Sequence, residues 1–291
     1  MSKIWFITGA ARGLGAEIAK AALAAGDRVV VTGRRREALE ATFGPDSDSV
    51  LSLSLDVTRE ADAVTAVDAA LARFGRIDVL VNNAGYGNLG LFEETTDAEA
   101  RAQYDTNVFG LYNVTRAVLP TMRGQRSGRI FNISSVGGLV GGEGGSLYCA
   151  TKFAVEGFSE SIAREVAPFG VHVTIVEPGF FRTDFLDETS VRYGSRQIDD
   201  YAEISTQMKA FWDARNHAQA GDPAKLGRVL IDLADRAAPP LRFAAGSDAL
   251  AMIGGKIDSL RAELDAWSDL SVTTDGDDLP APSEATAGAW R

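Results

Sequence analysis

Residues 3–15 read KIWFITGAARGLG, an apolar run that passes directly into a glycine-rich stretch. The run predicts a buried strand at Lys3–Thr8, and the periodic pattern that follows predicts a helix at Gly13–Ala25. Glycines between a strand and a helix let the backbone turn tightly and approach a pyrophosphate, which binds at the helix N-terminus. The stretch therefore predicts nucleotide binding, with a tight turn that holds no ligand as the alternative. The residues expected to contact the nucleotide are Gly9, Arg12, Gly13, Leu14 and Gly15.

Short apolar runs alternate with helical patterns along the rest of the chain, which indicates repeated βα units and a parallel sheet. Several runs are apolar throughout, as expected for strands that are covered on both faces. The further strands are expected at Arg28–Thr32, Val50–Leu55, Ile77–Val81, Arg129–Ile133, Val171–Val176 and Leu241–Ala245. The further helices are expected at Arg35–Phe43, Glu60–Phe74, Ala98–Met122, Leu147–Ala167 and Pro223–Asp235.

Two regions depart from this rhythm. Residues 180–220 form a long insertion that mixes aromatic and charged side chains. It is either an extra helical pair or a lid over the strand ends, where open α/β sheets bind ligands. Near the C-terminus, residues 247–267 have the pattern of an amphipathic helix, and residues 275–291 have a composition typical of disorder. We expect one domain over residues 1–274 and a disordered tail.

The bulk composition excludes several classes of protein. The chain has 291 residues and a net charge of −11, which argues against nonspecific binding of nucleic acid or of anionic membranes. Its single cysteine, Cys149, allows no intrachain disulfide, and with two histidines it disfavours a zinc centre. The chain shows no signal-peptide pattern and no apolar run that could span a bilayer, so we expect a cytoplasmic protein without a metal.

A possible reaction centre lies in the second half of the chain. Tyr148 and Lys152 are four residues apart and share one face of a predicted helix. An ammonium fixed beside a phenol stabilises the phenolate and is expected to lower its pKa from about 10. The hydroxyl of Ser135, just past a strand end, can then hold a carbonyl oxygen while Tyr148 exchanges a proton with it. Asn107 is a further candidate, although alone it indicates only a polar helix surface.

The end of the second predicted strand bears on the choice of nucleotide. The dinucleotide fold usually places an acidic residue there to bind the ribose 2′-hydroxyl. This chain has Arg34 and two further arginines instead, and Arg12 lies within reach in the glycine loop. Cations suit a 2′-phosphate and predict NADP(H), with a solvated helix start as the alternative. Asp56 and Val57, after the third strand, are expected at the adenine, or Asp56 is a turn residue.

Two further strand ends are expected at the same crevice. The fourth strand leads into Asn83, Ala84 and Gly85, residue types that suit a tight turn beside a cofactor. The sixth strand leads into Pro178 and Gly179, which turn the chain out of the sheet. Beyond them, Thr183 can bind the nicotinamide carboxamide, or the segment is a plain turn.

Together these motifs resemble the short-chain dehydrogenase/reductase family, in its shorter single-domain branch. The matching residues are Thr8, Gly9, Gly13, Gly15, Asn82, Asn83, Ala84, Gly85, Asn107, Ser135, Tyr148, Lys152, Pro178, Gly179 and Thr183. The resemblance covers about residues 3–246 and implies a Rossmann-type, doubly wound, seven-stranded parallel sheet with helices on both faces. It implies hydride transfer between a nicotinamide and a carbonyl or secondary alcohol.

The resemblance also implies a role for each residue of the reaction centre. Tyr148 is the proton donor in reduction, and Lys152 lowers its pKa and binds the nicotinamide ribose. Ser135 positions the substrate oxygen, and Asn107 holds a water that links Lys152 to solvent. The arginines Arg12 and Arg34 resemble the NADP-preferring pattern, which favours carbonyl reduction. The expected function is therefore an NADP(H)-dependent carbonyl reductase that acts on a small to medium apolar ketone.

Two departures from the family pattern bear on the substrate and on assembly. Residues 137–145 are rich in glycine and predict a roomy or mobile pocket. The extra residues after Ala245 put the usual tetramer in doubt, so a dimer or a monomer stays open. The alternative functions are reduction of a carrier-bound 3-oxoacyl group and a non-catalytic NADP-binding sensor. The complete Ser, Tyr, Lys and Asn set argues against the sensor.

Overall fold

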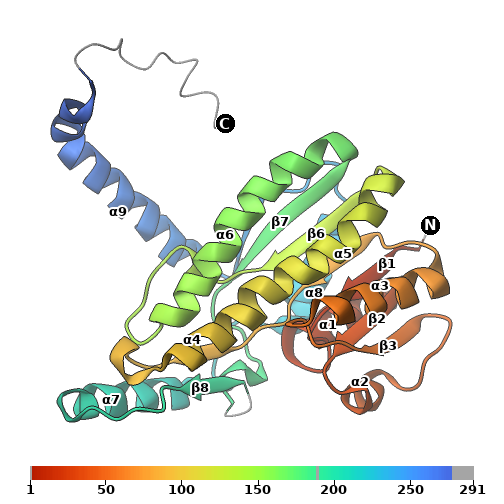
Figure 1. Ribbon diagram of the computed structural model, residues 1–291, viewed down its shortest axis with the longest axis horizontal. Coiled ribbons are helices and arrows are strands. Elements are labelled where there is room, and N and C mark those ends of the chain that lie inside the picture. Colours follow the sequence, from red (N-terminus) through yellow and green to blue (C-terminus); the bar gives the residue numbers. More distant parts are fainter. Residues whose placement is uncertain (1, 188–189, 277–291) are drawn as a thin grey trace.

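The computed structural model describes residues 2–187 and 190–276 and contains a seven-stranded parallel sheet with helices on both faces (Figure 1). In spatial order the strands are β3 (Val50–Ser54), β2 (Arg28–Gly33), β1 (Ile4–Ile7), β4 (Val79–Asn82), β6 (Gly128–Ile133), β7 (Val171–Pro178) and β9 (Arg242–Ala245). The strand order reverses between β1 and β4, which is the point where doubly wound sheets form a ligand crevice at their carboxyl ends. The predicted fold class is confirmed.

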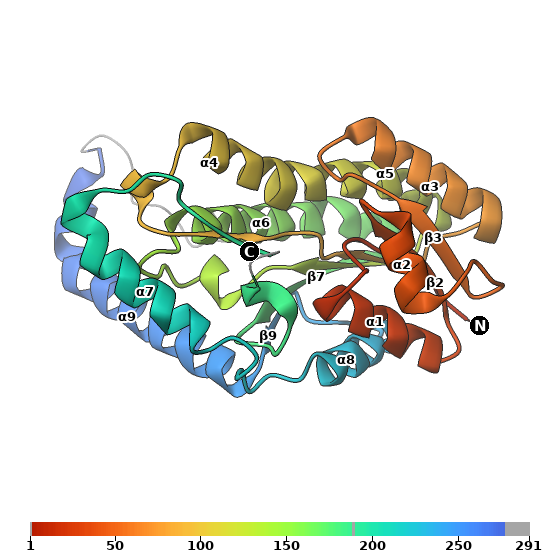
Figure 2. The same cartoon turned by 90° about the horizontal axis from the view of Figure 1, so that it is seen from below.

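The apolar strands are explained by the two layers that cover the sheet (Figure 2). In β1, Trp5 and Ile7 point into one hydrophobic core, and Ile4 and Phe6 point into the other. All four are buried, because successive side chains of a strand alternate between its faces. One face is covered by α1 (Gly13–Ala24), α2 (Arg36–Phe43) and α8 (Pro223–Asp235), and the other by α3 (Glu60–Phe74), α5 (Gly110–Gln125) and α6 (Ser146–Val166).

One predicted helix is divided in the structure. The single helix expected at Ala98–Met122 consists of α4 (Asp97–Tyr104), a π-helical turn (Asp105–Phe109) and α5. Thr96 and Glu99 form a capping box at the start of α4, which fixes where this helix begins. The π-helical turn inserts one extra residue per turn and shifts the side chains that follow it, and such turns often lie at functional sites.

The insertion at residues 180–220 adds a second layer at the carboxyl ends of the strands. Its short strand β8 (Val191–Tyr193) pairs in parallel with β5 (Gly87–Leu89), outside the main sheet. Within the described residues it contributes one α-helix, α7 (Ala202–Asp213), rather than the helical pair considered as an alternative. Short 3₁₀ turns occur at Phe92–Glu94, Val136–Gly138, Ala167–Phe169, Asp184–Leu186, Asp199–Tyr201 and Val272–Thr274.

The C-terminal helix α9 (Ser247–Ser271) is longer than the sequence predicts. It leaves the body after its first turns and projects from it (Figure 1). Most of the predicted disordered tail, residues 277–291, lies outside the described residues. Across residues 2–187 and 190–276, no helix combines the length and apolarity that crossing a bilayer requires.

Candidate active site

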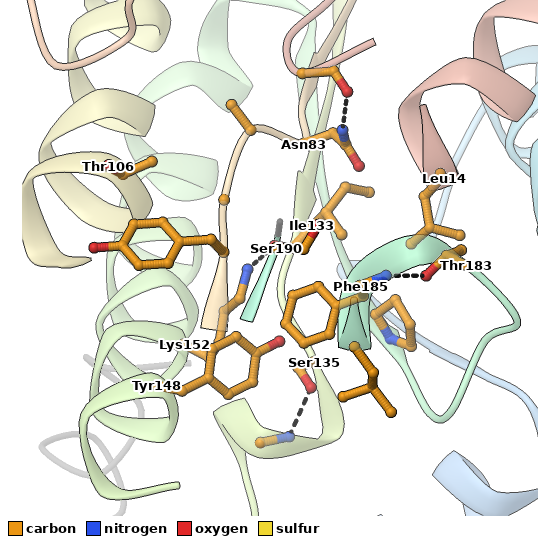
Figure 3. A pocket seen from close by; sticks show the side chains of 18 of the residues that line it. Leu14, Asn83, Thr106, Ile133, Ser135, Tyr148, Lys152, Thr183, Phe185 and Ser190 are labelled. Carbon is orange, nitrogen blue, oxygen red and sulfur yellow. Dashed lines mark hydrogen bonds between the residues drawn. The ribbon is translucent and has the colours of Figure 1, made fainter. Parts of the chain in front are cut away.

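One cavity of about 960 Å³ opens at the carboxyl ends of the central strands (Figure 3). Its wall contains residues from the glycine loop, from the ends of β2, β4, β6 and β7, and from the insertion. Of the residues predicted for the site, those that line this cavity are Gly9, Arg12, Gly13, Leu14, Arg34, Asp56, Val57, Asn83, Ala84, Gly85, Ser135, Tyr148, Lys152, Pro178, Gly179 and Thr183. Gly15 and Asn107 are the two that do not.

The glycine loop forms a cradle with an open helix end. Helix α1 starts at Gly13, and its N-terminus has no side-chain cap and no acidic residue in the first turn. Its first N–H groups and the positive end of its dipole therefore suit an anion such as a pyrophosphate. Gly9 and Gly13 have φ values of +64° and +58°, which favour glycine. Thr183 lies beside this loop, since a Cβ on Gly13 would be 3.7 Å from the Cβ of Thr183.

Gly15 acts in packing rather than at the cavity surface. A Cβ at this position would lie 2.5 Å from Asn83 Nδ2 and 2.6 Å from the Gly9 carbonyl oxygen. Asn83 Nδ2 donates to the carbonyl oxygens of Thr8 and Gly9 at 2.9 and 3.1 Å. The Thr8 hydroxyl accepts from the N–H groups of Asn83 and Ala84. The end of β4 is thus joined to the glycine loop, and Gly15 lets helix α1 approach this junction.

Ser135, Tyr148 and Lys152 converge on one part of the cavity (Figure 3). Ser135 follows β6, and its hydroxyl accepts from the Gly137 N–H at 3.0 Å. Tyr148 and Lys152 lie on successive turns of α6, with Lys152 Nζ 5.7 Å from the centre of the Tyr148 ring. Lys152 is buried, and its Nζ donates to the Ile133 carbonyl oxygen at 2.7 Å. The arrangement places two hydroxyls near a fixed ammonium in the wall of the cavity.

The protonation of this group differs from the sequence prediction. Burial raises the pKa of Tyr148 to about 12, and the hydrogen bond from Ser135 opposes this only in part. The pKa of the phenol therefore lies above its ordinary value of 10 and not below it, as the sequence predicts, while the role of Lys152 in lowering it stays a prediction. Burial also lowers the pKa of Lys152 to about 8, against the opposing charge of Glu156. Desolvation penalises the charged form of each group and is the largest cause of both shifts. Tyr148 is a neutral phenol at neutral pH.

Asn107 lies behind the cavity wall, in the π-helical turn. Its Nδ2 donates to the Tyr86 carbonyl oxygen at 3.0 Å and to Thr151 Oγ1 at 3.1 Å. Its Oδ1 accepts from the Tyr86 N–H. These bonds tie the turn to helix α6 next to Lys152 and to the segment after β4. The bound water that the family resemblance assigns to Asn107 stays a prediction.

The arginines at the end of β2 differ in their surroundings. Arg34 is exposed and lines the cavity. Arg36 is held in two ion pairs, with Glu40 and with Asp46, both at 2.7 Å. Arg12 lines the cavity from the glycine loop, and its Nη2 donates to Ser190 Oγ at 2.7 Å. Asp56 Oδ1 accepts from the Thr58 N–H and hydroxyl. Asp56 is therefore a turn residue, as the alternative prediction has it, and it also lines the cavity.

The wall opposite the glycine loop is aromatic and aliphatic. Phe185 lies 5.6 Å from the Tyr148 ring, and Phe180 lies 6.1 Å from Trp212, measured between ring centres. The Phe180 N–H donates to Asp248 Oδ2 at 2.7 Å, which joins the turn after β7 to the start of α9. Met252 of α9 also lines the cavity.

Several lining residues escaped the sequence prediction. Tyr86 and Arg192 lie 5.0 Å apart, guanidinium carbon to ring centre, and join the β5 and β8 segments. Met252 comes from a helix that the sequence placed outside the site. Aromatic enrichment in residues 180–220 was the one signal for this wall, since it contains Phe185 and Trp212. No periodicity marks Tyr86, Arg192 or Met252, because the tertiary structure brings them to the cavity.

One group of potential metal ligands lies near the insertion. Within the described residues, Asp184, Asp187 and His217 have ligand atoms within 4.8 Å of one another. His217 Nε2 lies 3.0 Å from Asp187 Oδ1, and Asn216 Nδ2 donates to the same oxygen. These contacts account for the cluster as a polar network at the protein surface.

Comparison with known proteins gives a consistent result along most of the chain. The family model described as short chain dehydrogenase matches residues 3–193. Among curated proteins, the chain is 38% identical to an oxidoreductase, BOA17, of Botryotinia fuckeliana over 281 residues, covering 94% of this chain and 100% of that protein. It is 38% identical over 244 residues to a 3-ketodihydrosphingosine reductase of Bacteroides thetaiotaomicron, covering 84% of this chain and 88% of that protein.

A solved structure extends the similarity over the C-terminal region. A short-chain dehydrogenase from Streptomyces avermitilis is 44% identical, with a TM-score of 0.86. The match covers 95% of this chain and 100% of the other. The glycine loop, the reaction centre and the insertion therefore belong to one architecture that recurs in known proteins.

Proposed function

The chain belongs to the short-chain dehydrogenase/reductase family, and from this premise we propose that it is an NADP(H)-dependent reductase of an apolar ketone. Members of this family are oxidoreductases that bind a nicotinamide cofactor and act on carbonyl or alcohol groups. The observation that carries the proposal is the convergence of Ser135, Tyr148 and Lys152 in the cavity that also contains the glycine loop.

The residues present fit a nicotinamide dinucleotide. The uncapped N-terminus of α1 and the side-chain-free surface of Gly9 and Gly13 suit the pyrophosphate. Lys152 and Thr183, which line the same cavity, are suited to the ribose and carboxamide of the nicotinamide. When bound, the nicotinamide supplies or accepts the hydride.

The protein supplies the proton. In the direction of reduction, the Ser135 hydroxyl donates a hydrogen bond to the substrate carbonyl oxygen and holds it beside Tyr148. The neutral Tyr148 phenol gives its proton to this oxygen, and the product is an alcohol. Because its pKa is about 12, the phenol is present in the donating form at neutral pH. Lys152, with a pKa of about 8, can return a proton to Tyr148 near neutrality.

Arg34 supports the preference for NADP(H). It is exposed, lines the cavity and stands where the fold usually has the acidic residue that binds an unphosphorylated ribose. A guanidinium there can make charge-assisted hydrogen bonds with a 2′-phosphate. Arg12 binds the same 2′-phosphate in this proposal, after its guanidinium releases Ser190 Oγ.

The substrate side of the cavity supports an apolar ketone. Phe180, Phe185, Trp212 and Met252 present carbon surface to the cavity, and Phe185 lies next to Tyr148. The Bacteroides relative is a reductase of a ketone, 3-ketodihydrosphingosine, which agrees with this class of reaction. The insertion at residues 180–220 acts in this proposal as a lid that excludes water from the reacting oxygen.

A nucleotide titration tests the proposal. Purified protein is titrated with NADPH and with NADH, and a panel of aliphatic and aromatic ketones is then added while nucleotide oxidation is followed. We expect tighter binding of NADPH and oxidation that depends on a ketone. Arg34→Ala should weaken NADPH binding about tenfold and leave NADH binding unchanged, since a charge-assisted pair is lost.

The matched control is Arg36→Ala, whose guanidinium is already paired with Glu40 and Asp46. It should leave the ratio of the two affinities unchanged. Equal binding of NADPH and NADH would overturn the NADP assignment alone. Binding without turnover of any ketone would favour the sensor function, and turnover restricted to carrier-bound 3-oxoacyl groups would favour that alternative.

A further inference from the structure

Helix α9 has two parts with different surroundings. Its first turns are anchored on the body, where Ala249 is fully buried and Asp248 accepts from the Phe180 N–H. The helix then runs outward for several turns beyond the body (Figure 1). Isolated surface helices of this kind are stabilised mainly by the packing of an apolar face. The outer part of α9 has no such packing among the described residues of its own chain.

A continuous apolar stripe follows this helix. Its members are Leu250, Ile253, Ile257, Leu260, Leu264 and Trp267, with alternating spacings of three and four residues. This is the a and d pattern of a heptad repeat, sustained from the anchored turns to the outer end. Leu250, Ile257, Leu264 and Trp267 are each more than 60% exposed, and Leu260 is 50% exposed. An aligned row of large apolar side chains in solvent marks an interaction surface.

The charges beside the stripe select one partner geometry. Lys256 and Glu263 occupy the g positions, and Arg261 occupies an e position. In a parallel pair of α9 helices, Lys256 would face Arg261 of the partner subunit, which is a repulsive contact. In an antiparallel pair, Lys256 would face Glu263 of the partner subunit, twice by symmetry. Charge complementarity therefore favours a second copy in the antiparallel arrangement.

The apolar stripe is self-complementary in this same register. When Ile257 lies opposite Leu260 of the partner subunit, Ile253 lies opposite the partner's Leu264. Leu250 then lies opposite the partner's Trp267, so all six stripe residues are matched. Gly254, at an e position beside the stripe, lies opposite the partner's Arg261. Within its own chain this position is open, because a Cβ at Gly254 would meet nothing within 4 Å. Helix α9 also has five acidic and two basic residues, which disfavours an anionic membrane as the occupant.

From this geometry we infer that the protein self-associates through α9, as an antiparallel, two-fold symmetric helix pair. The pair is isologous: the same surface is used on both chains, as in most two-fold homodimers. Since Asp248, in the first turn of α9, accepts from the Phe180 N–H beside the cavity, the interface is joined directly to the substrate side.

Sedimentation velocity of the full chain over a range of concentrations tests this inference. Leu260→Glu, in the middle of the stripe, should halve the mass of the assembly or raise its dissociation constant at least about tenfold, because a charge would be buried in the core. The matched control is Ala262→Glu, on the opposite face of the same helix. It should leave the mass unchanged. NADPH binding and circular dichroism confirm that each variant is folded.

Charge exchange tests the direction of pairing. Lys256→Glu and Glu263→Lys should each weaken association, and the double variant Lys256→Glu/Glu263→Lys should restore it. In a parallel pair, Lys256→Glu would instead strengthen association, since glutamate would face Arg261. A mass that Leu260→Glu leaves unchanged would overturn the inference. So would a monomer that binds vesicles containing phosphatidylserine through the same stripe.

Discussion

The two sides of the cavity are built on different principles. On the cofactor side, residues 8–15 and 82–85, positions are fixed by hydrogen bonds that side chains make with main-chain groups, as in the bonds of Asn83 Nδ2 to the carbonyl oxygens of Thr8 and Gly9. On the substrate side, residues 137–145 and 180–213, contacts between pairs of side chains fix the positions. Phe185 against Tyr148 is one such contact. The residues of the cofactor side can therefore be predicted from local sequence motifs. The residues of the substrate side come together only in the folded chain.

The largest effect is expected at Tyr148, which lies between the two sides. Tyr148→Phe removes the proton donor and keeps the ring that packs on Phe185. We expect kcat/KM for the ketone to fall about 10³-fold, the scale of general acid catalysis. The dissociation constant of NADPH should change less than about twofold, since the cofactor side is intact. Steady-state kinetics and fluorescence titration measure the two.

Tyr112→Phe is the control for Tyr148→Phe. Tyr112 is a helix α5 residue that packs on Phe158, 4.3 Å away between ring centres, and it does not line the cavity. This variant should keep full activity. A Tyr148→Phe enzyme with near-normal kcat/KM would show that another group delivers the proton.

The next effect concerns Glu177, at the end of the strand that leads to the substrate side. It is 2% exposed and lies 3.5 Å from Arg242 Nε. Burial and the neighbouring Glu156 carboxylate raise its pKa from 4.5 to about 7. Between these values the folded protein keeps a proton that the unfolded chain has lost. Stability is therefore expected to fall as pH rises through this window.

Urea unfolding at several pH values measures this contribution. Between pH 4.5 and pH 8, the wild type should lose on the order of 2–3 kcal/mol relative to Glu177→Gln, at about 1.4 kcal/mol per pKa unit. Glu165→Gln, an exposed change on α6, is the control and should follow the wild type. If the curves of wild type and Glu177→Gln run parallel, the carboxyl of Glu177 titrates normally.

The difference between the two sides also explains how far sequence reasoning reaches. The strands, the glycine loop and the spacing of Tyr148 and Lys152 follow from local patterns, and the predicted sheet is confirmed. The division of the helix at Asn107 was not foreseen, because a π-helical turn leaves the apolar pattern nearly unchanged. The β5 and β8 strands have three residues each and are joined only by the folded chain.

Local sequence patterns also did not predict the pKa values and polar contacts of the site. The sequence places a lysine beside Tyr148, and proximity alone predicts a lowered phenol pKa. In the folded chain, desolvation raises the pKa of Tyr148 instead. Arg12 likewise lies where the glycine loop predicts, but its bond to Ser190 depends on the insertion. Burial and the path of residues 180–220 are properties of tertiary structure.

Replacing a glycine on the cofactor side should affect both nucleotide binding and stability. In Gly15→Ala the added methyl group meets Asn83 Nδ2 and the Gly9 carbonyl oxygen at about 2.5 Å, so main chain must move. We expect a loss of about 2 kcal/mol in the free energy of unfolding, as in overpacked cores, and weaker NADPH binding. Gly124→Ala in α5 is the control. A Cβ there would meet nothing within 4 Å, and this change should be neutral or stabilising.

The same replacement on the substrate side should have a smaller and separate effect. Gly144 has φ +69°, and a methyl group there would overlap Met208 of α7. Because the end of a methionine side chain can shift, the cost is about 1 kcal/mol, mostly from the left-handed backbone. We expect Gly144→Ala to move α7 and to raise KM for the ketone about 3-fold. The affinity for NADPH should stay unchanged. Initial rates at saturating NADPH measure this.

Gly142→Ala is the matched control for Gly144→Ala. It lies in the same segment and lines the cavity, but its Cβ would meet nothing within 4 Å. Gly144→Ala/Met208→Ala should recover part of the change in KM, because the overlap is relieved while the backbone strain remains. If Gly144→Ala weakened NADPH binding as much as it raised KM for the ketone, the two sides of the cavity would be structurally coupled. Independent changes would mean that the substrate side can vary while the cofactor side stays fixed.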